Sequence, residues 1–493
     1  MRANPPVPTA AWRVALVAAT FAIYSVSLLN EFVWDDLDLV VWDPVVRNEA
    51  PISSYWTEPL QRKGWALSFW RPLPSTVYAV TERVVGFEAF AYHLVSIAAH
   101  AGVVLMLFEW LRRMGIRDPV AAAASALYAA HPYLTPAVTY VSGLADPLAA
   151  FFGLGALILW SEGGRKTFLG CAAWTVALFC KEWALLLPVL AIWTLRRDPG
   201  FRASRDRWLA TCAAIAAVYF SARYVVFKGY PVFHSVPMGW KERIACAIGS
   251  LAFYLGGGFL PFRLRMDRLY PLDSAEFWTW AALGVLIGWL LIRGILRLRR
   301  ECPRALPGIA WFALFWILHS NLLRPLNAHF AEHWMYFAYA GLAWSAAEVW
   351  QAKRPASRVW ILALAAIGIF WAAQNIAWQR KWRDEITLFE SNIAAGADAA
   401  RTHAALGFAY GKKGNYPKAS EQFEQALERD PFYYRGLWGL ARCEYRFGHY
   451  ARAVAIARIA ARVFPEERGD LDPFIRTCLE KRAGRKPATQ KRS

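Results

Sequence analysis

Twelve apolar runs of spanning or near-spanning length divide most of this chain. A helix needs about 20 predominantly apolar residues to cross a bilayer. Hydrophobic residues make up 57% of the 493 positions, more than a soluble globular protein carries. We therefore expect an all-α polytopic membrane bundle, with runs at residues 12–30, 90–111, 119–136, 138–160, 167–180, 183–195, 208–227, 243–262, 276–296, 306–323, 333–350 and 358–377.

The formal net charge of +19 does not indicate a nucleic-acid partner, because the Lys and Arg residues fall mostly in short clusters between the apolar runs. Seven cysteines, an odd number without C-x-x-C spacing, indicate neither a disulfide framework nor a zinc site. The first run lacks a small-residue cleavage site before residue 31, so we interpret it as an uncleaved membrane helix.

Basic clusters predict which turns face the cytoplasm. They place the first long loop, residues 31–89, on the extracytoplasmic side. The clusters are Arg112, Arg113 and Arg117; Arg165 and Lys166; Arg196, Arg197, Arg202, Arg205 and Arg207; Arg297, Arg299, Arg300 and Arg304; and Lys353, Arg354 and Arg358.

Only an even number of crossings fits between Arg207 and Arg297, although three runs lie there. We expect 243–262 not to cross, because its glycines at 256–258 weaken a helix; three arginines that follow it, at 263, 265 and 268, argue against this choice. About 11 spanning helices result, and the chain after Trp378 then lies outside. Twelve crossings would place it in the cytoplasm.

From about residue 385 the apolar runs stop and a 34-residue period begins. This pattern resembles tetratricopeptide repeats, whose stacked helix pairs form an α-solenoid with a groove that commonly binds peptide. We expect a repeat domain at 379–480, with repeats at about 400–433 and 434–467, and a disordered basic tail at 481–493. The residue pairs one period apart are Gly414 and Gly448, Tyr416 and Tyr450, Ala419 and Ala453, Ala426 and Ala460, and Pro431 and Pro465.

Four carboxylates follow the first run directly, in the sequence EFVWDDLD at residues 31–38. Asp35 and Asp36 would face water at the bilayer edge, where they could serve an interfacial active site; the alternative is that they only mark the end of the hydrocarbon. Asp36 and Asp38 have the D-x-D spacing that holds Mg²⁺ or Mn²⁺ in many sugar transferases. We keep a metal as the minority interpretation.

Further polar motifs stand at the ends of later runs. They are WRPL at 70–73, His93 and His100 two helical turns apart, HPYLTPAVTYVSGLAD at 131–146, CKEW at 180–183 and AEHWMY at 331–336. In this order, with FVWDD before them and the repeats after them, they resemble the transmembrane and tetratricopeptide-repeat O-mannosyltransferases of the GT-C class. The resemblance is dense over 31–183, thin over 184–330, and returns over 331–470.

The resemblance implies a GT-C membrane domain over 1–378, a polyprenyl-phosphate-sugar donor, and catalytic acids at Asp35 and Asp36. Three positions depart from the family pattern: Pro136, Leu144 and the EHWMY string at 332–336. These departures put the identity of the sugar and the acceptor in doubt.

The chemistry can also be argued from the residues. A sugar on a polyprenyl phosphate already carries a good leaving group, so the protein must deprotonate an acceptor hydroxyl and neutralise phosphate. Asp35 or Asp36 is the candidate general base. Candidate phosphate-binding cations are Arg71, Lys181 and Arg223; their structural alternatives are a loop anchor, a partner for Glu182 and a headgroup contact, respectively.

Four more residues are candidates for substrate binding: His93, His131, Asp146 and Glu332. A charge within a span costs about 2.5–3.5 kcal/mol on insertion scales, which makes Asp146 the hardest to explain structurally. Its alternative is a helix kink beside Pro147.

We therefore predict a glycosyltransferase that moves mannose or a similar sugar to a hydroxyl, expected on protein Ser or Thr, on the extracytoplasmic face. The competing hypothesis is a non-enzymatic membrane scaffold that recruits a protein through its repeats. A transporter is a third class, but no inverted repeat is visible. Ala- and Arg-rich usage without an N-x-S/T sequon favours a bacterial inner membrane over the endoplasmic reticulum.

Overall fold

A computed structural model of the chain describes residues 7–59, 61–62, 65–66, 70–196, 199–228, 238–266, 268–353 and 358–484. The chain forms two compact units. One comprises Met1–Leu264 and Tyr270–Arg383, and the other comprises Arg265–Leu269 and Asp384–Ser493. Arg197, Arg354 and most of the expected basic tail, residues 485–493, lie outside the described residues.

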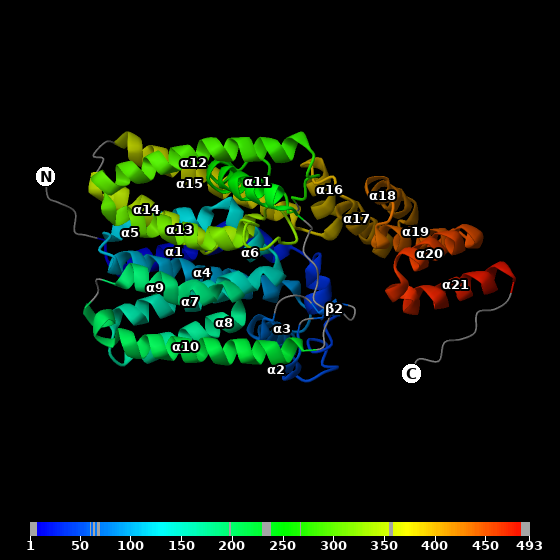
Figure 1. Ribbon diagram of the computed structural model, residues 1–493, viewed down its shortest axis with the longest axis horizontal. Coiled ribbons are helices and arrows are strands. Elements are labelled where there is room, and N and C mark those ends of the chain that lie inside the picture. Colours follow the sequence, from blue (N-terminus) through cyan, green and yellow to red (C-terminus); the bar gives the residue numbers. More distant parts are fainter. Residues whose placement is uncertain are drawn as a thin grey trace. The chain divides into compact units, whose positions relative to one another are not determined.

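Each of the twelve apolar runs contains a helix of the first unit, and Figure 1 shows most of these helices running along one common direction. This confirms the all-α membrane bundle. The helices are α1 (Thr9–Tyr24), α4 (Ala89–Arg113), α5 (Asp118–Ala130), α7 (Ala145–Glu162), α8 (Lys166–Cys180), α9 (Leu187–Leu195), α10 (Pro199–Phe227), α11 (Trp240–Leu251), α12 (Ala275–Glu301), α13 (Leu306–His319), α14 (Ala338–Lys353) and α15 (Arg358–Lys381).

Six helical segments in the described part of the chain are long and apolar enough to span a membrane. They are Thr9–Leu29, Ala89–Arg113, Val141–Glu162, Pro199–Phe227, Ala275–Glu301 and Arg358–Lys381. Adding the shorter helices α5, α8, α9, α13 and α14 gives the expected eleven. That count stays a prediction, because a helix of 13 to 16 residues, such as α5 or α14, is shorter than the hydrocarbon core.

Shorter elements connect these helices. The helical ones are α2 (Ser54–Thr57), α3 (Pro72–Val85), α6 (Thr135–Thr139) and the 3₁₀ or π turns η1 (Ser25–Leu29), η2 (Leu37–Val41), η3 (Pro132–Leu134), η4 (Val141–Leu144), η5 (Glu182–Leu186), η6 (Ala252–Gly257), η7 (Pro303–Ala305) and η8 (Glu332–Met335). Strands β1 (Gln61–Arg62) and β2 (Trp65–Ala66) form a small antiparallel ribbon in which Gln61 lies opposite Ala66. The sequence did not predict this ribbon.

A proline determines where one of the apolar runs leaves the helix. α5 ends at Ala130 because His131 precedes Pro132, and a residue before proline avoids the α conformation. The run 138–160 enters α7 only at Ala145. Asp146 is therefore the second residue of α7, at a helix N-terminus, where a carboxylate is stabilised by the helix dipole.

The last helix of the bundle ends beside the start of the first loop. Tyr24 Oη accepts a hydrogen bond from Asn375, Ser27 N donates to Gln379 Oε1 over 3.1 Å, and Glu31 N donates to Arg383 O over 2.8 Å. The paired positions increase together, so α1 and α15 run in the same direction. The chain thus leaves the bundle at the end that carries residues 31–89, as an odd number of crossings requires.

The packing of the run 243–262 on α12 fits the non-crossing course that we expected. Gly284 of α12 packs against Ile248 of α11, and Gly288 packs against Leu251 one turn further along. The two helices therefore run parallel and begin at the same end of the bundle. The chain after η6 must return to that end before α12 starts, which fits a run that does not cross, and the number of crossings stays a prediction.

The second unit contains the repeats. Its helices are α16 (Glu385–Ala394), α17 (Ala400–Lys412), α18 (Tyr416–Arg429), α19 (Tyr434–Arg446), α20 (Tyr450–Val463) and α21 (Arg468–Arg482). Gly414 and Gly448, one period apart, have φ values of +79° and +82°, which glycine adopts without strain. Phe423 packs against Gly407 and Gly439, where a Cβ would clash with its ring.

Residues 265–269 belong to this second unit. Arg265 Nη1 donates to Ala395 O over 3.0 Å, and Met266 N donates to Asn392 Oδ1 over 2.6 Å. Arg265 and Arg268 are each 4% exposed. Because these arginines are buried in protein, they are not the exposed loop charges on which topology rules depend.

Candidate active site

Two arginines converge on one carboxylate at the end of the bundle that carries the first loop. Arg71 precedes α3, where Pro72 and Pro74 favour the first helical turn. Its Nη2 lies 3.0 Å from Glu182 Oε2 and its Nε lies 3.2 Å from the same oxygen. Arg223, near the end of α10, has Nη1 3.8 Å from Glu182 Oε1. These three residues place two positive charges around one negative charge.

A buried ion pair lies next to this group. Lys181 follows α8 in an extended conformation, and its Nζ lies 2.6 Å from Asp146 Oδ2. Trp183 Nε1 donates to the other oxygen of Asp146 over 3.2 Å. The Lys181 and Asp146 side chains are 10% and 3% exposed. Both oxygens of Asp146 are thus engaged, and Lys181 is neutralised in place.

The two groups form one electrostatic cluster. Arg71 interacts with Asp146 and Lys181 as well as with Glu182, and His333 interacts with Asp146, Lys181 and Arg71. Three cations face two carboxylates, which leaves one positive charge when the histidines are neutral. Such a site favours a bound anion.

Asp36 is the buried member of the acidic pair. Its Oδ1 accepts hydrogen bonds from Ser142 N over 2.7 Å and from Ser142 Oγ over 2.6 Å, and its Oδ2 accepts one from Val33 N over 3.2 Å. Burial raises the pKa of the Asp36 carboxyl to about 7, although these hydrogen bonds oppose the shift. Through these hydrogen bonds Asp36 connects the first loop to Ser142 of η4, which lies four residues before Asp146.

Asp35 is different, because its side chain is partly exposed. The preceding residue, Trp34, has φ +53°, a left-handed conformation that a bulky residue rarely adopts. The Trp34 ring lies 6.3 Å from that of Tyr140. Backbone strain of this kind is concentrated at functional sites, and here it sets the direction of the chain into Asp35.

The acidic loop and the cation cluster meet through neighbouring groups. The hydroxyl of Tyr78 on α3 interacts electrostatically with both Asp36 and Arg71. Ser142, which binds Asp36, is the second residue of the helical segment Val141–Glu162, which carries Asp146. The structure therefore brings five predicted residues together, Arg71, Lys181, Arg223, Asp146 and Asp36, with Asp35 next to them in the chain.

Three other predicted residues make different contacts. His93 is 1% exposed, and its Nε2 lies 3.2 Å from Asn30 O, at the entrance to the first loop. The ring of His131 lies next to that of Tyr339, with ring centroids 4.4 Å apart and the planes tilted by 31°. Glu332, 2% exposed, interacts electrostatically with Tyr339. These contacts position loops and helices, and any role in substrate binding stays a prediction.

The sequence interpretation did not select three residues of the cluster. Glu182 was considered only as a partner for Lys181, whereas it binds two arginines. His319 interacts with Lys181 and Asp146, and His333 does the same from η8. The AEHWMY motif pointed to this segment, but successive residues of a 3₁₀ turn face directions about 120° apart, so choosing Glu332 missed His333.

No group of three or more His, Cys, Asp or Glu residues that could hold a metal occurs among the described residues. Asp36 has both oxygens occupied by N–H and O–H donors, which speaks against it as a ligand of the D-x-D type. Metal dependence itself stays untested.

Known proteins resemble this chain in two ways. A tetratricopeptide repeat model matches residues 405–468. Protein O-mannosyl-transferase F38B6.6 of Caenorhabditis elegans is 21% identical over 433 residues, which are 85% of this chain and 62% of that protein. Protein O-mannosyl-transferase TMTC3 of Homo sapiens is 23% identical over 477 residues, 84% of this chain and 51% of its own. The chain resembles protein O-mannosyl-transferases along most of its length.

The resemblance expected from the motifs is thus confirmed. The chain spans between half and two thirds of the length of these two O-mannosyl-transferases. Among solved structures, ArnT from Cupriavidus metallidurans bound to undecaprenyl phosphate is similar with a TM-score of 0.46 and 16% identity, covering 91% of this chain and 80% of ArnT. The expectation of a multi-pass membrane protein is also confirmed, whereas the particular membrane stays a prediction.

Proposed function

We propose that this protein is a membrane glycosyltransferase that moves mannose or a similar sugar from a polyprenyl phosphate to a hydroxyl group of a protein. The observation that carries the proposal is the convergence of Arg71, Arg223 and Glu182 with the Lys181 and Asp146 pair, beside the loop that bears Asp35. A cationic cluster at the end of a membrane bundle suits a lipid-linked phosphate, and an adjacent carboxylate suits an acceptor hydroxyl.

Asp35 is the general base in this proposal. Its carboxylate takes the proton of the acceptor hydroxyl while the oxygen bonds to the anomeric carbon of the sugar. The bond between that carbon and the phosphate oxygen breaks, and polyprenyl phosphate leaves. Asp36 cannot share this role easily, because its oxygens already accept three hydrogen bonds. It is a positioning residue that holds the loop.

Arg71 and Arg223 stabilise the leaving phosphate. The donor is a phosphate diester with one negative charge, and the departing monoester gains a second. Cations that face this phosphate therefore stabilise the transition state more than the bound donor, which is the requirement for acceleration. Glu182 holds the two guanidinium groups in place, whereas Lys181 is already neutralised by Asp146 and has a structural role.

The direct test uses the purified full chain in lipid nanodiscs. Radiolabelled polyprenyl-phosphate sugars are offered with Ser- and Thr-containing peptides, and the label on peptide is counted. We expect transfer from at least one donor by the native protein and none by the Asp35→Asn variant, while Asp38→Asn serves as a matched control on the same loop. A folded protein that transfers no sugar from any donor, or equal transfer by Asp35→Asn, would reject the proposal.

The repeats are proposed to present the polypeptide acceptor. A tethered binding site raises the local acceptor concentration, up to about mM for short linkers. Arg435 lies over the ring of Phe408 and Arg442 over the ring of Trp438, and both exposed cations belong to α19 of the second repeat. Replacing both arginines with alanine should raise the KM for protein acceptor and leave that for donor unchanged. An unchanged acceptor KM would leave the repeats as a subunit-binding module.

A bacterial inner membrane remains the proposed location, with the endoplasmic reticulum as the alternative. The competing scaffold function rests on the repeat domain, since such grooves commonly recruit partners. A scaffold, however, has no use for the cation cluster. Copurification of a stoichiometric partner, together with absence of transfer from every donor, would favour the scaffold.

A further inference from the structure

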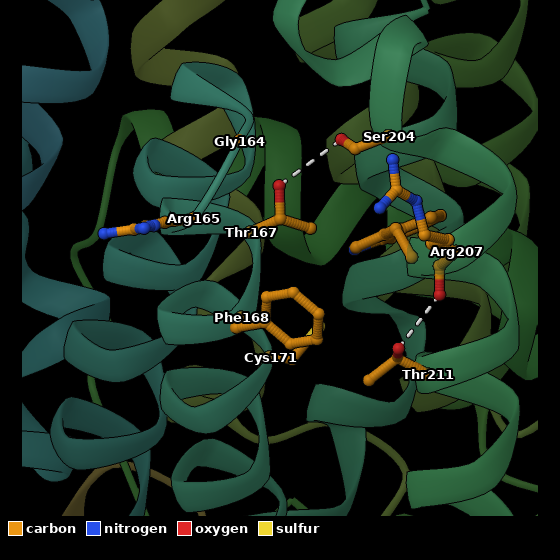
Figure 2. Close-up of a pocket in the computed structure, with 9 residues that line it drawn as sticks. Gly164, Arg165, Thr167, Phe168, Cys171, Ser204, Arg207 and Thr211 are labelled. Atoms are coloured by element: carbon orange, nitrogen blue, oxygen red, sulfur yellow. Dashed lines mark hydrogen bonds between the residues drawn. The ribbon is translucent and has the colours of Figure 1, made fainter.

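A cavity lies between α8 and α10, at the end of the bundle opposite the acidic loop. It begins at the turn between α7 and α8, around Gly164, whereas Lys181 and Asp146 mark the other ends of those helices. Its volume is about 190 Å³, enough for about six water-sized groups, since water occupies about 30 Å³ in the liquid. It is therefore separate from the proposed catalytic site. Figure 2 shows that its walls come from both helices.

The cavity presents hydrogen-bond donors beside apolar groups. The hydroxyl groups of Thr167 and Ser204, which line it, are hydrogen-bonded to each other, with their oxygens 3.3 Å apart (Figure 2). Trp208 also lines it and is 1% exposed, but its indole N–H has no hydrogen-bond partner in the described part of the chain. A buried N–H left without an acceptor is costly, and a bound oxygen would satisfy it.

Two arginines, Arg165 and Arg207, line the same cavity. Three other cations nearby are each paired with a carboxylate; they are Lys166, Arg113 and Arg205.

Arg165 and Arg207, in contrast, make no ion pair with any described residue of the chain, although both line the cavity. The positive end of α8 adds to their field. Among the described residues, an anion would meet two cations without a carboxylate partner and one unpaired N–H there. The hydroxyl groups of Thr167 and Ser204 already bond to each other, and Ser204 also donates to backbone carbonyl oxygens.

The surface next to the cavity is apolar. Phe168, which lines it, is 65% exposed, and Leu169 beside it is 60% exposed. Further along α10, Val218 is 69% exposed. A ligand with a phosphate group and hydrocarbon chains fits both parts of this surface, whereas a soluble phosphate would use only the polar part.

We propose that this cavity binds the headgroup of an anionic phospholipid of the cytoplasmic leaflet, with its acyl chains lying on α8 and α10. Basic pockets between membrane helices on the cytoplasmic side bind such headgroups, and the basic clusters assign this end to the cytoplasm. The phosphate contacts Arg207, Arg165 at the rim of the cavity adds positive charge, and an oxygen of the headgroup accepts the Trp208 N–H. The site is independent of glycosyl transfer.

The test measures lipid retention by native mass spectrometry on the full-length protein in detergent. Phosphatidylglycerol is compared with phosphatidylcholine on the native protein and on two double variants. Arg165→Gln with Arg207→Gln removes the two cations of the cavity. Arg202→Gln with Arg205→Gln serves as the matched control. It removes two exposed cations of α10, the helix that carries Arg207, and neither of them lines the cavity.

We expect preferential retention of phosphatidylglycerol by the native protein. Loss of the cavity arginines should weaken it by about fivefold for each cation, as expected for one charge at a membrane surface, whereas the control pair should retain it. Trp208→Phe keeps the ring and removes the N–H, and should weaken binding by a smaller factor. Melting temperatures without lipid confirm that all variants are folded.

Three results would overturn the proposal. Equal weakening in both double variants would show binding by diffuse charge. Equal retention of phosphatidylcholine would show that the protein does not distinguish an anionic headgroup from a zwitterionic one. Displacement of the lipid by soluble glycerol phosphate at similar concentration would assign the cavity to a soluble phosphate.

Discussion

Ser142 gives Asp36 two hydrogen bonds across 106 residues of chain, one from its backbone N–H and one from its hydroxyl. The contact joins the loop after α1 to the segment that leads into α7. It also separates the roles of two adjacent acids. Asp36 is fully buried and both of its carboxylate oxygens accept hydrogen bonds, whereas Asp35 is partly exposed.

The two acids should therefore respond differently to the same substitution. Asp35→Asn should lower turnover by about 10²- to 10⁴-fold, the usual worth of a general base, and leave the melting temperature unchanged. Asp36→Asn should destabilise the protein by about 1–3 kcal/mol, because its amide N–H₂ faces a backbone N–H that has lost its acceptor. Turnover assays and thermal melts on both variants distinguish the roles. Equal turnover and equal melting in the two variants would contradict the division.

Stability should depend on pH through Asp36. The pKa of this carboxyl is raised from 3.8 in the unfolded chain to about 7 in the folded protein. Between those values the folded state binds more protons than the unfolded state, so the stability contribution of Asp36 is greatest in acid and falls as pH rises. The fall is about 4 kcal/mol over this window.

Melting of the native protein and of Asp36→Asn across this pH range isolates the contribution of the group. The variant should lose the downward slope. Ser142→Ala removes a hydrogen bond that holds the pKa down, so its slope should extend to higher pH. A native slope that survives in Asp36→Asn would assign the pH dependence to other groups.

The buried pair of Lys181 and Asp146 should show strong coupling. Lys181→Met leaves a charged carboxylate in the protein interior and should cost about 3–5 kcal/mol. The double variant with Asp146→Leu removes both charges and should recover most of that loss. Denaturation of the four proteins of this cycle gives the coupling energy; a double variant as unstable as the single one would mean that the ion pair is not the source of the loss.

Arg71 and Arg223 should govern turnover with the donor. Arg71→Gln or Arg223→Gln should lower kcat by about tenfold or more and raise the donor KM by a smaller factor, because a hydrogen bond to the charge that develops on the leaving phosphate is lost. The acceptor KM should not change. Arg71→Lys keeps the charge but not the planar fork, so partial recovery is expected. Steady-state kinetics with each substrate varied in turn checks this prediction. A rise in the acceptor KM alone would mean that the donor phosphate does not bind at these arginines.

Topology provides a test without substrate. Ser53→Cys and Ser420→Cys should both react with a membrane-impermeant thiol reagent added from outside, while Arg299→Cys at the opposite end of α12 should be protected. The native cysteines are replaced in this background. Protection at position 420 together with labelling at 53 would restore twelve crossings and separate the repeats from the proposed active face.

The helices of the bundle could be predicted from hydrophobicity alone, because burial in lipid requires continuous apolar runs. The repeat turns were equally readable, since Gly414 and Gly448 occupy positions where positive φ excludes most other residues. Hydrophobicity alone did not predict the helix break near Pro132, which follows from the steric effect of proline on the preceding residue. The course of α11 was predicted only because the basic clusters on either side of it require an even number of crossings.

The site was harder to predict, because its geometry depends on pairings between distant segments. Arg71, Lys181 and Arg223 were selected individually, but no sequence pattern shows that Glu182 binds two arginines and leaves Lys181 to Asp146. The burial of Asp36 depends on Ser142, which lies on another element. His333 was passed over for its neighbour because the direction of a side chain in a 3₁₀ turn depends on how the turn docks.

The seam between α1 and α15 has a consequence for biogenesis. Ser27 donates to Gln379, a residue 352 positions later in the chain. At synthesis rates of about 5–20 residues per second, the polar end of the first helix waits roughly 20–70 s for its partner. During that interval Ser27 and Asn30 must be satisfied by something other than the finished protein. Water at the membrane interface can satisfy these polar groups until the last helix arrives and displaces it.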